Sequence, residues 1–142
     1  MFKEKWDKPE DKLNNLPKWL SKKDSSINRL IAFYSAIFFG RYGIKPTISN
    51  WGKTGSLLKS LLEENSEVMI ASAMWVYFHL EDNYLEKHYY PLDLLPRNFT
   101  KSQVELKVSI GKDFNNPEGL KKWLKRNTLE VIKKYMIDVS QR

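Results

Sequence analysis

The residues best suited to chemistry in this chain are tryptophans that stand among basic side chains. Trp6, Trp51 and Trp123 each have lysine or arginine neighbours within three residues. Cations bind phosphates and release counterions, and flat rings can stack on exposed bases for roughly 1 to 3 kcal/mol each. We therefore expect nucleic-acid binding, to DNA in the first place, through Lys121, Lys122, Lys125, Arg126, Lys133, Trp51 and Lys53.

The same tryptophans also fit a hydrophobic core, because aromatic residues at helical spacing are typical of buried helix faces. Trp75, inside an apolar helical pattern, is expected in the core. Trp51 stands in a turn beside a glycine at a helix start, where the sequence favours exposure and burial equally. For the cations, the alternative is a solvated basic surface without a specific partner.

The positive charge is concentrated at the two ends of the chain. Residues 1–50 carry ten Lys/Arg against five Asp/Glu, residues 51–100 four against seven, and residues 101–142 ten against five. Basic ends around an acidic centre suit a negatively charged partner. The longest apolar run, residues 27–39, is interrupted by polar residues and is shorter than the ~20 residues of a membrane span. We therefore expect a soluble cytoplasmic protein with no membrane partner.

Nucleotide and hydrolase motifs are incomplete. Gly52-Lys53-Thr54 resembles the end of a phosphate-binding loop, but that motif requires a glycine five positions before Gly52, where this chain has Thr47. No Gly-x-Ser-x-Gly elbow is present, and the chain has no cysteine. We therefore expect that the protein is not an enzyme and needs no cofactor.

Metal binding is also not indicated. The spacing of His79 and His88 fits no zinc pattern. Glu81, Asp82, Glu86 and His88 could gather around a hard cation, although a polar helix end followed by a solvated loop explains these residues better. We expect no metal site.

The elements that position these residues begin with an N-terminal arm, residues 1–24, in which Pro9 and Pro17 interrupt any helix. Trp6 and Trp19 on this arm are costly to leave in water, so they either fold back or bind a partner. Apolar residues at spacings of three and four then predict three helices: 26–41, from 50–54 to 64, and 67–80.

The C-terminal part contains the hardest segment to assign. Residues 81–100 are expected to form a structured loop. The next segment, residues 101–110, gives two conflicting signals. Thr100-x-x-Gln103 resembles the capping box of a helix. The apolar residues alternate as in a strand, which we favour weakly: Val104, Leu106, Val108 and Ile110. Asn116-Pro117 predicts the start of a helix that continues to Val139.

That last helix is expected to be amphipathic. At about 100° per residue, Lys122, Lys125, Arg126 and Lys133 fall within an arc of about 100°. They lie beside an apolar face of Leu120, Leu124, Val131, Ile132, Tyr135 and Val139. The sequence therefore predicts a mainly α protein: one compact helical domain of four to five helices over residues 25–142, with one short strand or hairpin near 101–110.

One segment resembles a known module. Tyr34, Phe38, Tyr42-Gly43 and Pro46, then Trp51-Gly52-Lys53, Leu57-Leu58-Lys59, Leu62 and Tyr77-Phe78, are similar to a helical module of phage and plasmid replication proteins. The module occurs in replisome organisers and helicase-loading accessory proteins. The resemblance implies an accessory role in DNA replication, with Trp51 and Lys53 as DNA contacts.

Two functions follow as hypotheses. The first is a non-catalytic DNA-binding accessory protein of phage or mobile-element replication or gene expression, which uses the basic stripe of the C-terminal helix. The alternative is a factor that binds a host or replisome protein, such as a helicase or a polymerase, through Trp6 and Trp19.

Overall fold

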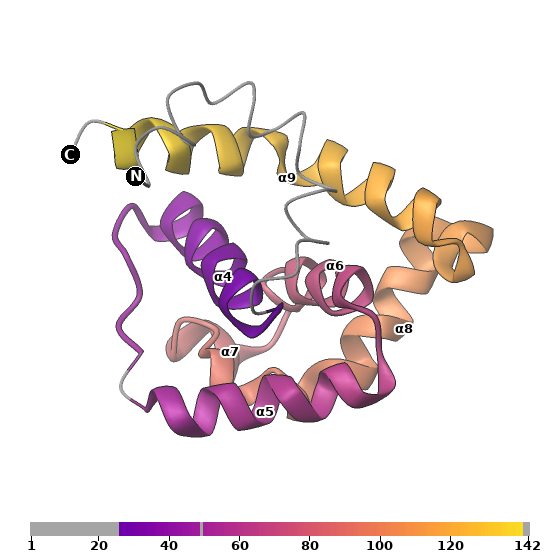
Figure 1. Cartoon of the computed structure of the whole chain (residues 1–142), viewed down its shortest axis with the longest axis horizontal. Coiled ribbons are helices and arrows are strands. Elements are labelled where there is room, and N and C mark those ends of the chain that lie inside the picture. The colour runs from indigo at the N-terminus through magenta and orange to yellow at the C-terminus, as the bar shows by residue number, and fades with distance from the viewer. Residues whose placement is uncertain (1–25, 49, 141–142) are drawn as a thin grey trace. The chain divides into compact units, whose positions relative to one another are not determined.

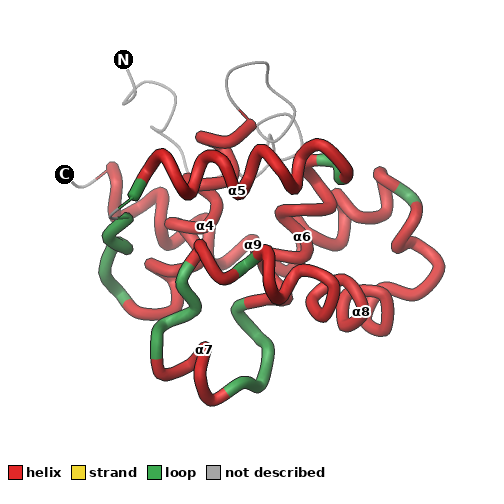
Figure 2. Tube along the Cα trace, turned by 90° about the horizontal axis from the view of Figure 1, so that it is seen from below, coloured by secondary structure: helices red, strands yellow, loops and turns green. Residues whose placement is uncertain are grey.

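The computed structural model describes residues 26–48 and 50–140, with side chains as far as Lys133. The predicted arm, with Trp6 and Trp19, lies outside the described residues. Within them every regular element is helical, as Figure 2 shows. The α-helices are α4 (Ser26–Tyr42), α5 (Trp51–Glu64), α6 (Glu67–Tyr77), α7 (Asn83–Lys87), α8 (Phe99–Ile110) and α9 (Pro117–Ser140). The mainly α class is confirmed, with six α-helices in the described part in place of the expected four to five.

Side-chain caps begin the helices where the sequence predicted them. The side chain of Asn50 accepts a hydrogen bond from the Lys53 N–H at 2.9 Å, and α5 starts at the next residue, Trp51. Ser66 does the same for the Met69 N–H at 3.2 Å before α6. Such caps satisfy N–H groups that have no partner within the first turn.

The strand predicted near residues 101–110 is wrong. Residues 99–110 form helix α8, and its buried side chains are Phe99, Ser102 and Leu106, at spacings of three and four. This stripe packs against α6, so burial follows the helical period and leaves Val104 and Val108 exposed. Tertiary packing therefore overrides the alternating pattern of apolar residues.

The segment 81–100 is more ordered than the expected loop. It contains α7 and two 3₁₀ turns, η1 (Leu92–Leu94) and η2 (Pro96–Asn98). Asp82 caps α7 by accepting a hydrogen bond from the Leu85 N–H at 3.0 Å. Both proline-bounded turns pack against α5, which gives this irregular stretch a fixed place.

The chain divides into two compact units. One contains residues 48–124, in which α6 lies beside α8, as Figure 1 shows, and α5 packs on η1, η2 and α6. The other joins α4 to the part of α9 that begins at Lys125. The expectation of a single domain over residues 25–142 stays a prediction.

Candidate nucleic-acid interface

Helix α9 presents the apolar face that its sequence predicts. Leu120, Leu124 and Ile132 are buried, and Thr128, on the same face, is buried with them. Val131 is half-buried. Tyr135 and Val139 lie beyond the described side chains. Burial of this face leaves the remaining faces of the helix available to solvent.

The basic residues occupy the exposed side of α9. Lys122, Arg126 and Lys133 are exposed, and at about 100° per residue they fall within an arc of about 40°. Lys125 lies about 60° outside this arc and is half-buried. Leu129 lies about 20° outside the arc, on the side of Lys125, and is exposed. We call the three exposed cations Lys122, Arg126 and Lys133 the basic stripe.

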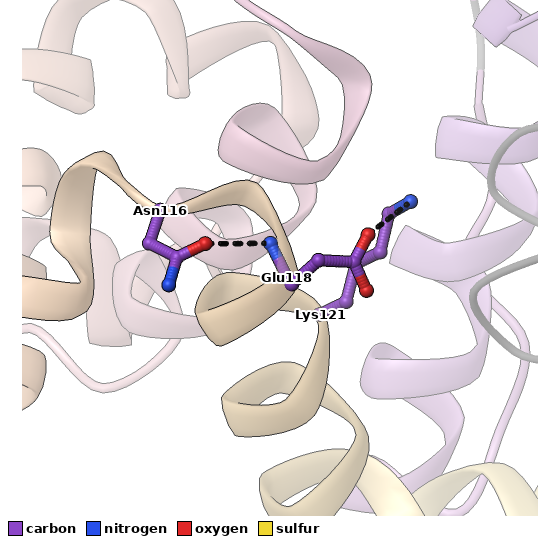
Figure 3. A network of polar contacts seen from close by, with 3 residues as sticks. All are labelled: Asn116, Glu118 and Lys121. Carbon is purple, nitrogen blue, oxygen red and sulfur yellow. Dashed lines mark hydrogen bonds and ion pairs between the residues drawn. The ribbon is translucent and has the colours of Figure 1, made fainter.

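The first turn of α9 carries an acidic neighbour of the stripe. The Asn116 Oδ1 accepts a hydrogen bond from the Glu118 N–H at 3.2 Å, and Glu118 Oε1 lies 3.6 Å from Lys121 Nζ (Figure 3). The Lys121 side chain is partly covered. An ion pair of this kind at the surface is worth about 0–1 kcal/mol, so Lys121 can leave Glu118 at little cost in free energy.

Trp51 and Lys53 lie on another element, at the start of α5. Trp51 is 59% exposed, which answers the question that the sequence left open. Lys53 is also exposed, and its backbone N–H is held by Asn50. An exposed indole beside a lysine can stack on a base while the cation meets a phosphate.

The two histidines are engaged within their own segments. His79 Nδ1 lies 2.7 Å from the Trp75 carbonyl oxygen, and the centroids of the two side-chain rings are 4.5 Å apart. Trp75 is half-buried rather than fully in the core. The His88 ring lies against the Tyr84 ring at a tilt of 42°, with the ring centroids 4.3 Å apart. Within the described residues, no group of three or more histidine or carboxylate side chains is placed to hold a metal ion.

Sequence reasoning missed two exposed aromatic residues at α7. Tyr84, within the helix, and Tyr89, after its end, are both largely exposed. The available signal was the tripeptide His88-Tyr89-Tyr90, which ends a short helix where a glycine is usual.

Comparison with protein-family models, with characterised proteins and with solved structures found no match to this chain. None of the helices in the described part is both long and apolar enough to cross a membrane.

Proposed function

We propose that this protein is a non-catalytic DNA-binding accessory protein of phage or mobile-element replication or gene expression. The observation that carries the proposal is the basic stripe: Lys122, Arg126 and Lys133 share one exposed side of a helix whose opposite side is buried.

The dimensions of the stripe fit a phosphate backbone. Lys122 and Lys133 are separated by eleven residues, which corresponds to roughly 16 Å along a helix. A DNA strand carries one phosphate per ~3.4 Å of duplex axis but winds around that axis, so a straight stripe of this length meets only a few phosphates. Leu129, beside the arc, can contact sugar or base edges next to the cations.

Two further observations support DNA as the partner. The exposed Trp51 and Lys53 provide a stacking ring and a cation in the segment that resembles the replication module. Lys125 and Lys121 add positive charge at the margin of the stripe. The replication role rests on this resemblance, whereas the DNA binding rests on the stripe.

Fluorescence anisotropy with labelled single- and double-stranded oligonucleotides across a salt series tests the proposal. Four phosphate contacts, from Lys122, Lys125, Arg126 and Lys133, give an expected slope of about −3 to −4 in log affinity against log salt. Absence of binding at about 50 mM salt would refute the proposal.

Two charge-reversal variants distinguish binding through the basic stripe from binding through net positive charge. The variant K122E/R126E/K133E should lose DNA binding at a salt concentration at which the wild-type protein is half bound. The control K59E/K87E/K101E makes the same change in net charge at exposed lysines of α5, α7 and α8. Equal losses in both variants would show that only net charge matters and would contradict a specific surface.

A further inference from the structure

Two side chains of α9 beside the basic stripe are not of the kind that binds phosphates. Leu129 is 37% exposed, and Glu130 is exposed as well. At about 100° per residue, Leu129 lies about 20° outside the arc of the stripe on one side, and Glu130 lies about 40° outside it on the other. The exposed face of α9 therefore carries an apolar group and a carboxylate in addition to its cations.

Both side chains have a cation of the stripe on either side along the helix. Arg126 stands three residues before Leu129 and four before Glu130, and Lys133 stands four and three residues after them. Residues at these spacings are neighbours on a helix surface, with Cβ atoms about 5–6 Å apart. Leu129 and Glu130 thus both lie between Arg126, one turn earlier, and Lys133, one turn later. All four residues belong to the same compact unit.

The carboxylate of Glu130 is available to a partner. The ion pair among the described side chains of α9 joins Glu118 to Lys121 and does not involve Glu130. A carboxylate in a surface that only binds phosphates would repel them and weaken binding. In the major groove of duplex DNA a carboxylate instead accepts a hydrogen bond from the N4 amino group of cytosine, and an apolar side chain packs on the methyl group of thymine.

The dimensions of this face fit the major groove. That groove is about 12 Å wide and admits an α-helix, whereas the minor groove is only about 6 Å wide. Arg126 and Lys133 are seven residues apart, which corresponds to roughly 10 Å along the helix. The long side chains of these two cations can therefore reach phosphates at the rims of the groove while Leu129 and Glu130 face the base edges.

We propose that Leu129 and Glu130 read base sequence in the major groove of duplex DNA. Glu130 accepts a hydrogen bond from a cytosine, and Leu129 contacts the methyl group of a thymine. Phosphate contacts carry no sequence information, so the basic stripe supplies affinity and these two residues supply specificity. This inference rests on the proposed DNA binding through α9 and adds to it a preference for particular sequences.

In vitro selection tests the inference with the full chain and a library of DNA duplexes that contain a randomised central segment. The wild-type protein should enrich duplexes with a cytosine and a thymine at fixed positions. Replacing the cytosine base pair of the selected duplex should weaken binding by about fivefold or more in fluorescence anisotropy, because one such contact discriminates between bases by at least that factor.

Glu130→Gln gives the sharpest comparison, because glutamine pairs with adenine in the major groove. This variant should select adenine at the position where the wild-type protein selects cytosine. Leu129→Ala should lose the preference for thymine and keep the preference for cytosine. If Glu130 were only a charge near the phosphates, Glu130→Gln would bind every sequence more tightly and select the same motif, which would overturn the inference.

Glu105→Gln is the matched control, since it removes one exposed carboxylate from α8, and it should select the wild-type motif. Duplex binding without enrichment of any sequence, or binding to single strands alone, would overturn this inference and leave the proposed DNA binding intact. Absence of all DNA binding at about 50 mM salt would refute the proposed function and this inference with it.

Discussion

Gly40 of α4 and Val131 of α9 approach so closely that a Cβ on Gly40 would lie 2.9 Å from Val131 Cγ1. Real Cβ contacts are almost never that short, and a β-branched valine has little rotamer freedom in a helix. Within the unit formed by residues 26–47 and 125–140, the absence of a side chain at Gly40 sets how near the two helices come.

Gly40→Ala should therefore lower the free energy of unfolding by about 1 to 2 kcal/mol, since overpacking costs more than the gain in helix propensity. Gly55→Ala is the matched control, because a Cβ on Gly55 of α5 meets nothing within 4 Å. It should raise the free energy of unfolding by about 0.5–1 kcal/mol. Urea denaturation measures both, and equal effects would contradict the close approach at Gly40.

Ser72, fully buried in α6, has a hydroxyl without a hydrogen-bond partner in the described structure. Ser72→Ala should raise the free energy of unfolding by about 1 kcal/mol, because an unsatisfied polar group is removed. Ser102 is equally buried, but its hydroxyl donates to the Asn98 carbonyl at 2.8 Å. Ser102→Ala should cost about 0.5–1.5 kcal/mol. Thermal unfolding compares the two serines, and a loss of stability in Ser72→Ala would show that its hydroxyl is satisfied.

The helical state of residues 99–110 predicts the effect of truncating the exposed valines. Val104→Ala and Val108→Ala should each raise the free energy of unfolding by about 0.5 kcal/mol, because alanine favours a helix more than a β-branched residue does. Leu106→Ala should lower it by about 2–5 kcal/mol, because Leu106 is fully buried. Chemical denaturation measures these changes. If Val104→Ala and Val108→Ala both lowered the free energy of unfolding, residues 99–110 would form a strand and not a helix.

The exposed indole of Trp51 predicts a preference for single strands. Trp51→Ala should weaken single-stranded DNA binding by about 1–3 kcal/mol and leave duplex binding nearly unchanged, because only unpaired bases offer a free face. Trp51→Phe should retain most of the affinity. If the two forms of DNA lost affinity equally, the ring would not act by stacking.

Much of the helical layout follows from local sequence. Asn50 and Ser66 cap the helices that begin after them, and Asn116-Pro117 begins α9 where expected. Spacings of three and four along α9 also predicted the burial of Leu120, Leu124 and Ile132, whereas Val131 is half-buried and the buried Thr128 was not predicted. These features depend on neighbours in the chain, so the sequence carries them directly.

Other features depend on contacts between distant residues. Val104 and Val108 alternate with Leu106, and only the packing of α8 on α6 selects the helix that exposes both valines. The exposure of Trp51 could not be inferred from its turn, since burial depends on which elements pack nearby. The left-handed turn at Tyr89 likewise requires Tyr90 to be held in the core.

The cations and the tryptophans thus differ in what determines their positions. The sequence alone determined that Lys122, Arg126 and Lys133 share one side of α9, because the helical period is a local property of the chain. Burial, which is a property of the whole fold, decided that Trp51 is exposed, that Trp75 is half-buried and that Lys121 is partly covered beside Glu118.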